Sequence, residues 1–228
     1  MKKHTFLAIA FTLAPIASLA EGFNGPYVGA VLGGASAEDK GTEYYRSNAT
    51  RDGLTSKSTP GGVLYGLSAG YDKTFGNNIL FGVAADYEGR GGSSDNAPQK
   101  ENGVVYDANY SVTSKLTSLA SLRVRLGYVI DHQALLYATA GYASARVKRT
   151  YHDDYPPAET ESHAKWQDGW TAGVGGEYLF TKNFSAAVEY RYSDFGSDRV
   201  DVGLWGARYY EKQKLSEETL RLQLAYRF

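Results

Sequence analysis

Apolar and polar side chains alternate strictly along residues 220–228, at the end of the chain. The apolar positions are Leu220, Leu222, Leu224, Tyr226 and Phe228. Period-two alternation predicts a strand whose two faces meet different environments. A strand that ends free presents an unpaired edge. We therefore expect it to pair with the first strand of the mature chain and to close a barrel.

The same alternation predicts seven further strands, each longer than the roughly five or six residues usual in soluble proteins. In chain order the eight predicted strands are Pro26–Ala37, Gly62–Phe75, Ile79–Arg90, Thr113–Ile130, Ala134–Lys148, Trp166–Phe180, Phe184–Phe195 and Glu218–Phe228. Such lengths suffice to cross a bilayer at a tilt. The predicted fold class is therefore all-β: an eight-stranded antiparallel up-and-down barrel.

Long and short connections alternate between these strands. The long polar connections are Glu38–Gly61, Gly91–Val112, Arg149–Lys165 and Gly196–Glu217, and the short turns are Gly76–Asn78, Asp131–Gln133 and Thr181–Asn183. This sorting is typical of bacterial transmembrane barrels, which have short periplasmic turns and long external loops. It predicts both termini on the short-turn, periplasmic side.

Aromatic residues cluster near both ends of the apolar face. Those on the turn side are Phe75, Phe81, Tyr128, Phe180, Phe184, Tyr226 and Phe228; those on the loop side are Tyr65, Tyr87, Tyr142, Trp170 and Tyr192. Two aromatic girdles around an aliphatic band are typical of a membrane-spanning barrel. A soluble eight-stranded barrel of the lipocalin kind would place the apolar face inside instead. Alternation alone does not choose between the two, but the loop sorting and the girdles favour the membrane.

The N-terminus and the composition limit the class of protein further. Residues 1–20 combine a basic start, an apolar run and small residues before a cleavage point, which predicts a secretory signal peptide followed by a barrel domain at 21–228. Cysteine is absent, so burial and hydrogen bonds must hold the chain together. A net charge of -1 argues against nucleic acid as a partner.

Charged side chains occupy the polar face of several predicted strands. If the apolar face meets lipid, the residues that point into the lumen are Asp86, Glu88, Arg123, Arg125, Glu177, Glu189, Arg191 and Arg221. Eight strands leave an interior just wide enough for side chains to fill. Since unpaired charges there would be costly, we expect one paired network. It would act as a structural plug or, alternatively, as a gate for small ions.

Candidate catalytic and metal-binding residues are few. His132 falls in a short turn, and His152 and His163 fall in the third long connection near Ser162, Asp153 and Asp154. Neighbouring serine and histidine residues do not make a triad without tertiary geometry. The histidine and aspartate spacing is not specific for a metal. The sequence therefore predicts no catalytic residue, no cofactor and no metal site.

Several motifs together resemble the small outer-membrane β-barrel family, which includes outer-membrane immunogenic proteins, opacity-type adhesins and the barrel half of OmpA. The motifs are residues 25–30 (GPYVGA), 121–128 (SLRVRLGY), 135–141 (LLYATAG), 169–178 (GWTAGVGGEY), 187–196 (AVEYRYSDFG) and 226–228 (YRF). The resemblance implies that Tyr226 and Phe228 form an assembly signal read by the barrel-assembly machinery. Because the sequence ends at Phe228, we expect the peptidoglycan-binding domain that follows the OmpA barrel to be missing here.

These observations predict a non-enzymatic protein integral to the bacterial outer membrane. We expect outer-membrane lipids and lipopolysaccharide around the barrel. External loops would be available for a host or surface ligand. A small gated ion channel of the porin-like kind is the alternative function, and a lipid A-modifying enzyme is a third.

Overall fold

The computed structural model of the protein describes residues 22–92, 94–204 and 208–228; the predicted signal peptide lies outside these residues. They form one antiparallel sheet of ten strands. The strands are β1 (Gly25–Tyr45), β2 (Arg51–Ser58), β3 (Gly61–Phe75), β4 (Ile79–Gly92), β5 (Asp95–Glu101), β6 (Val104–Ile130), β7 (Ala134–Asp153), β8 (Glu159–Leu179), β9 (Phe184–Val200) and β10 (Tyr209–Arg227). A short 3-10 turn, η1 (Gly76–Asn78), joins β3 to β4. Within the described residues, no helix has the length and apolar character needed to cross a membrane.

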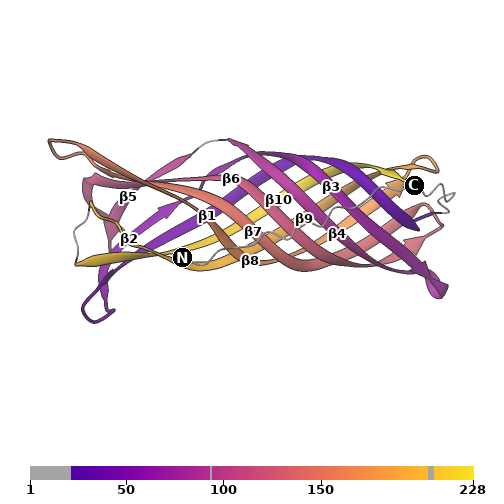
Figure 1. Ribbon diagram of the computed structural model, residues 1–228, viewed down its shortest axis with the longest axis horizontal. Coiled ribbons are helices and arrows are strands. Elements are labelled where there is room, and N and C mark those ends of the chain that lie inside the picture. The colour runs from indigo at the N-terminus through magenta and orange to yellow at the C-terminus, as the bar shows by residue number, and fades with distance from the viewer. Residues whose placement is uncertain (1–21, 93, 205–207) are drawn as a thin grey trace, which may run out of the picture.

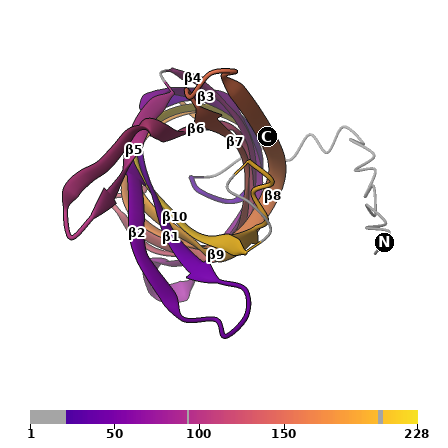
Figure 2. The same ribbon diagram turned by 90° about the vertical axis from the view of Figure 1, so that its left-hand side faces the viewer.

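Eight of the strands close into a ring in the order β10-β9-β8-β7-β6-β4-β3-β1. The closing pair is β1 with β10, in register from Tyr27 opposite Arg227 to Tyr45 opposite Tyr209. The predicted pairing of the first and last strands is therefore confirmed. Figure 1 shows the resulting long cylinder from the side, and Figure 2 shows the closed ring end-on.

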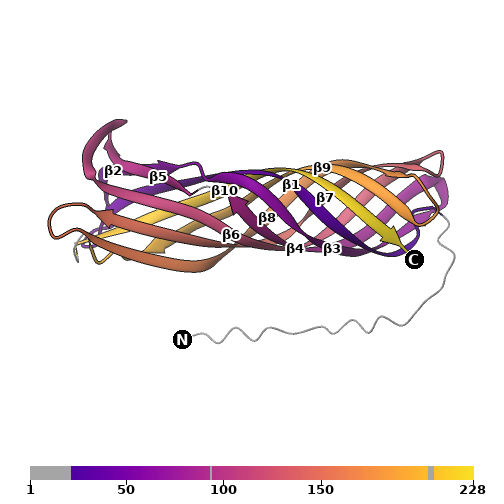
Figure 3. The same cartoon turned by 90° about the horizontal axis from the view of Figure 1, so that it is seen from above.

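The cylinder continues beyond the point where β3 and β4 end. β1 pairs with β3 up to Ser36 and then with β2 from Asp39, while β6 pairs with β4 at one end and with β5 at the other. Because β2 also pairs with β5, these two short strands take the places of β3 and β4 in the wall. Figure 3 shows β2 and β5 at the end opposite the C-terminus. We call this end the upper barrel.

The upper barrel corrects the prediction of four long loops. Most of those residues extend β1, β6, β7, β8, β9 and β10 or form β2 and β5. The outer face there carries many polar side chains, so the alternation that an apolar outer face reveals is hidden. The inner positions keep their period: Asp39 and Glu43 are buried, whereas Lys40 is exposed.

In the upper barrel, the neighbouring strands β8 and β9 are not joined by backbone pairing. Pairing between β8 and β9 ends at Trp170 opposite Asp194, although both strands continue. Side chains bridge the gap instead. Gln167 Nε2 donates to the Phe195 carbonyl at 3.1 Å, and Lys165 Nζ lies 2.7 Å from Asp198 Oδ1. The seam is therefore closed by polar contacts.

Apolar side chains cover the outside of the lower cylinder and charged ones fill its inside. Leu67 is 70% exposed and Leu222 56%, whereas Arg123 is 3% and Glu189 6% exposed. This orientation agrees with a membrane barrel and excludes the lipocalin-like alternative, in which the apolar face would be enclosed. The aromatic residues of both predicted girdles also lie outside, with Tyr192 and Phe228 half-buried.

All three predicted short turns are present, and a fourth tight turn was not predicted. Asn77, Asp131 and His132 have positive φ values in two of the predicted turns. Asn102 and Gly103, with φ of 50° and 84°, join β5 to β6. Asn-Gly between two strands is a strong hairpin signal, since both residues tolerate positive φ.

Candidate functional site: layered charges in the lumen

The middle of the lumen holds a network of buried acids and arginines. Its members are Asp86, Glu88, Arg90, Arg123, Glu189, Arg191, Glu217 and Arg221. Arg123 lies 2.5 Å from Asp86 and 3.2 Å from Glu189. Arg221 contacts the same two carboxylates at 3.0 and 2.9 Å and also binds Glu88. Four acids and four arginines therefore neutralise one another.

A second network lies nearer the short turns. Arg125 contacts Asp72 at 2.9 Å and Glu177 at 2.7 Å, and Arg227 contacts the same two acids at 3.0 and 2.7 Å. Tyr27 adds a hydroxyl 3.0 Å from Arg125. Asp72 fits because its partner in β4 is Gly82, where a Cβ would overlap the Asp72 carboxylate. This network is balanced as well, with two acids and two arginines.

The position of the eight predicted lumen residues differs from the expectation in one respect. All eight are buried, but Arg125 and Glu177 belong to the turn-side network, while the other six belong to the middle one. The expectation of one network is therefore corrected to two. Alternation along a strand gives the face on which a side chain lies. It does not give the height at which non-neighbouring strands bring charges together.

A third polar layer in the upper barrel has an excess of acid. Arg149 binds Asp39 through both Nε and Nη2, at 2.7 and 2.9 Å. Glu43 and Glu211 lie directly opposite each other in β1 and β10, and neither makes a salt bridge with any described residue. Gln99 donates to Glu43 at 3.2 Å, and Ser56 donates to Glu211 at 3.0 Å.

The excess acid changes the protonation of this layer. Burial, together with the Asp52 and Glu211 carboxylates, raises the pKa of Glu43 to about 7. Burial also raises the pKa of Glu211 to about 7, although Ser56 donates to its carboxylate. The upper layer therefore exchanges protons near neutral pH.

Apolar layers separate the polar ones. A cluster between the middle and upper layers comprises Ala37, Leu116, Leu119, Ala143, Ala145, Val147, Phe195 and Leu215. The cluster at the short-turn end comprises Phe23, Leu80, Val129, Leu135, Tyr137 and Leu179. Phe23 precedes β1, is 1% exposed, and stacks beneath the Arg227 guanidinium, 4.9 Å from the ring centre. Alternating apolar and charged layers thus fill the lumen along the described barrel.

Sequence reasoning missed several charged residues of the lumen. They are Asp39, Glu43, Asp72, Arg90, Arg149, Glu211, Glu217 and Arg227. A signal was available for some of them, because Glu211, Glu217 and Arg221 share one parity along β10. Extending the alternation of the last strand back through the predicted loop would have identified Glu211 and Glu217.

The candidate catalytic residues do not converge. Ser162 Oγ lies 2.9 Å from Thr150 Oγ1, while His163 Nε2 lies 2.7 Å from Glu161 Oε1. Ser162 and His163 are successive strand residues and so project from opposite faces. His152 Nε2 lies 3.2 Å from Thr113 Oγ1. In the part of the chain that the structure describes, no group of three or more His, Cys, Asp or Glu could hold a metal ion.

The predicted assembly residues lie at the outer edge of the turn side. Tyr226 packs against Phe184 and Phe228, with ring centres 5.2 and 4.9 Å apart. The Phe228 amide donates to the Pro26 carbonyl at 3.1 Å. The last strand therefore ends hydrogen-bonded to the start of β1. Recognition by the assembly machinery stays a prediction.

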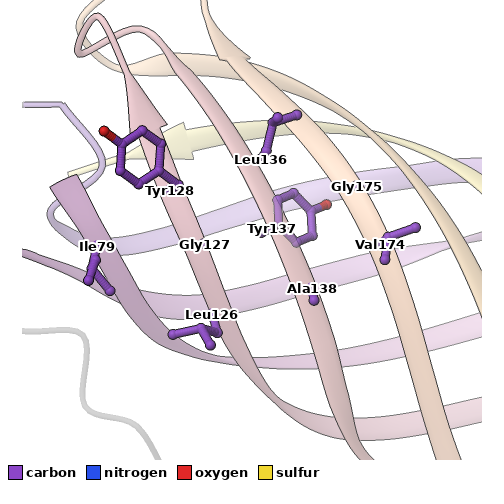
Figure 4. A pocket seen from close by; sticks show the side chains of 9 residues that line it. All are labelled: Ile79, Leu126, Gly127, Tyr128, Leu136, Tyr137, Ala138, Val174 and Gly175. Carbon is purple, nitrogen blue, oxygen red and sulfur yellow. The ribbon is translucent and has the colours of Figure 1, made fainter.

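The outer wall carries a shallow apolar hollow between β4, β6, β7 and β8. Figure 4 shows its lining, which comprises Ile79, Leu126, Gly127, Tyr128, Leu136, Tyr137, Ala138, Val174 and Gly175. Leu136 is 60% exposed there, while Tyr137 is 7% exposed. The hollow lies on the apolar outer face, and its lining suits contact with a lipid acyl chain.

Comparison with known sequences identifies relatives over most of the chain. A family model described as outer membrane protein beta-barrel domain matches residues 6–228. The 31 kDa outer-membrane immunogenic protein of Brucella melitensis is 31% identical over 176 residues, which cover 75% of this chain and 68% of that protein. The 22 kDa outer membrane protein of Rhizobium leguminosarum is 36% identical over 108 residues, covering 44% of this chain and 47% of that protein.

Solved structures share the fold at low sequence identity. The outer membrane protein OprG from Pseudomonas aeruginosa has a TM-score of 0.54 and 8% identity, covering 92% of this chain and 99% of its own. The outer membrane protease OmpT from Escherichia coli has a TM-score of 0.51 and 11% identity, covering 93% of this chain and 99% of its own. At these identities the likeness concerns the barrel fold alone.

Proposed function

Because the chain belongs to the outer membrane protein beta-barrel domain family and is a protein of the bacterial outer membrane, we propose that it is a closed, non-enzymatic barrel that presents a rigid recognition surface outside the cell. In this proposal the short turns and both termini face the periplasm. The upper barrel stands above the membrane and carries the surface that contacts a host or surface ligand.

The filling of the lumen is the observation that carries the proposal. Each arginine of the two lower networks contacts at least two carboxylates, and apolar clusters lie above and below. Buried ion pairs with several partners resist rearrangement, since breaking one leaves an uncompensated charge. An open path for ions would need several of these contacts to break together.

The shape of the upper barrel supports a role in recognition. At the tip of the β5–β6 hairpin, the first residues of β6 are Val104, Val105 and Tyr106, which are 72%, 46% and 60% exposed. Across the β1–β10 seam, Tyr44 stacks on Tyr210 and Tyr45 packs on Tyr209. Exposed apolar and tyrosine side chains on a well-ordered support are typical of binding surfaces.

Two measurements test the proposal. Refolded protein in planar bilayers should give no sustained conductance steps; steps whose size follows salt concentration would instead support the gated channel. Cells that display the protein should bind a host or matrix surface. Binding should fall when the exposed side chains Val104, Val105 and Tyr106 are replaced by serine, which leaves the β2–β5 pairing through Lys100 and Glu101 in place.

A matched control separates recognition from loss of folding. Replacing the periplasmic turn residues Thr181 and Lys182 by serine alters a short connection at the other end of the barrel. That variant should bind as the unchanged protein does. Equal binding by all three forms would contradict the recognition role. A mass change in lipid A on expression would contradict the non-enzymatic assignment.

A further inference from the structure

Three basic side chains form one patch on the outer wall of β6 and β7. Lys115 in β6 lies directly opposite Lys148 in β7, and Arg146 lies two residues before Lys148 on the same face. All three are exposed. Like charges directly opposite each other destabilise a sheet unless an anion lies between them. We call Lys115, Arg146 and Lys148 the basic patch.

No carboxylate among the described residues lies within salt-bridge distance of the basic patch. Some exposed lysines elsewhere on the upper barrel have acidic partners: Lys40 and Lys57 both lie 2.5 Å from Glu38. On β8, Asp168 is the outward carboxylate opposite Ser144, and it accepts hydrogen bonds from Tyr142 and Ser144 at 2.6 Å each. The patch therefore keeps a net positive charge.

The patch lies just outside the membrane. Tyr142 pairs with Trp170, and both belong to the loop-side aromatic girdle that marks the interface. Arg146 is four residues further along β7. At about 3.3 Å per residue and a strand tilt of roughly 40°, its Cα is about 10 Å beyond the girdle. This is the level of lipid headgroups, and long basic side chains there reach toward them.

The neighbouring residues suit a sugar phosphate. Trp166 pairs with Arg146 across β7 and β8 and is 37% exposed, so that an indole ring belongs to the surface beside the patch. Thr150 and Ser162, whose hydroxyls lie 2.9 Å apart, border the patch on the side away from the membrane. Hydroxyl groups and an aromatic ring beside cations can contact a sugar and its phosphates at the same time.

We propose that the basic patch binds the phosphate groups of a phosphorylated glycolipid in the outer leaflet, of the lipid A type. The lipid phosphate takes the place of the missing carboxylate between Lys115 and Lys148, and Arg146 provides a planar donor below it. The proposal depends on the location of the barrel in the outer membrane. It does not depend on the closed lumen or on a surface ligand.

The test compares two triple variants of the full chain. Lys115→Gln/Arg146→Gln/Lys148→Gln removes the patch, and Lys40→Gln/Lys57→Gln/Lys214→Gln removes the same charge from the other side of the barrel. Each refolded protein is incorporated into phosphatidylcholine nanodiscs and titrated with lipid A, with bound glycolipid counted by native mass spectrometry. Folding is verified for each by its gel mobility with and without boiling.

The patch variant should bind lipid A at least about tenfold more weakly than the unchanged protein, since each basic residue near an anionic lipid surface contributes on the order of a few-fold in affinity. The control should stay within about twofold. Dephosphorylated lipid A should bind the unchanged protein as weakly as the patch variant binds lipid A. Phosphatidylglycerol and inorganic phosphate should not compete at equal concentration.

Three results would overturn the proposal. Equal loss in both triple variants would show that net charge alone attracts the lipid. Equal affinity for dephosphorylated lipid A would exclude the phosphate. Unchanged binding by the patch variant would place the glycolipid elsewhere on the wall. None of these results bears on conductance or on cell binding.

Discussion

Glu43 and Glu211 face each other across the seam where the first strand closes on the last, and no cation among the described residues pairs with either one. The pKa of each is raised to about 7 from the usual 4.5. The folded barrel thus holds protons that the unfolded chain releases. The contribution of these two carboxyls to the free energy of unfolding should be greatest below about pH 4.5, should fall as the pH rises, and should reach its lower level above about pH 7.

Replacing Glu211 by Gln should therefore stabilise the protein at pH 8, on the order of 1–3 kcal/mol, and flatten the pH dependence. The amide keeps the side chain's shape and can accept the hydrogen bond from Ser56. Urea unfolding in micelles at pH 5, 7 and 9, followed by tryptophan fluorescence, measures both effects. Glu218→Gln, an exposed change on the same strand, is the control. If the pH dependence of the free energy of unfolding were unchanged in the Glu211 variant, Glu211 would not be the group that binds the proton.

The double change Arg123→Ala/Glu189→Ala should destabilise the barrel. It removes Arg123 from Asp86 and Glu189 from Arg221 in the middle network, and breaking buried ion pairs costs about 3–5 kcal/mol. The exposed pair Glu38→Ala/Lys40→Ala should cost roughly 0–1 kcal/mol. Unfolding in urea compares the two. If the double variant kept full stability and only gained conductance in planar bilayers, the network would be a gate.

Phe23 should contribute strongly to stability at the short-turn end. Phe23→Ala leaves a cavity beneath the Arg227 guanidinium, and such changes cost about 3–5 kcal/mol. Phe75→Ala is the control, because Phe75 is 56% exposed on the outer wall. The gel-shift temperature should fall clearly for the first variant only. An equal fall of the gel-shift temperature in both variants would mean that buried Phe23 contributes no more to stability than exposed Phe75.

Gly41 should be intolerant of a side chain. A Cβ at this position would overlap the Glu211 carboxylate and the Ser56 hydroxyl, whereas a Cβ at Gly34 would meet nothing within 4 Å. We expect Gly41→Ala to lower stability by about 1–3 kcal/mol, as overpacking does, and Gly34→Ala to be nearly neutral. Unfolding curves at pH 5 and pH 8 check this. Neutrality at Gly41 would show that the Glu211 carboxyl can move aside.

The sequence predicts the lower barrel well because two solvents impose the pattern there. Lipid outside and charge inside make Leu222 and Arg221 alternate without ambiguity. In the upper barrel both faces tolerate polar residues, so the alternation predicts a last strand that begins only at Glu218, although β10 starts at Tyr209. The Asn102–Gly103 turn was the local signal that β5 and β6 form a hairpin.

Other parts of the candidate site depend on relations that no local pattern encodes. Asp72 and Glu177 share Arg125 and Arg227 because the tilt of the strands brings β3 and β8 to the same height. Phe23 lies before the first strand and offers no periodicity at all. These contacts follow from the stagger of the closed ring, which is a property of the whole chain.

The replacement of β3 and β4 by β2 and β5 in the upper wall has a consequence for immune recognition. Neighbours on that wall, such as Lys57, Lys40 and Lys214, come from three strands, and β10 is remote in the chain from β1 and β2. An antibody raised against the intact protein would therefore bind epitopes assembled from several strands. A linear peptide copied from any one segment would also expose the inward half of its residues, and would be a poor vaccine mimic of the native surface.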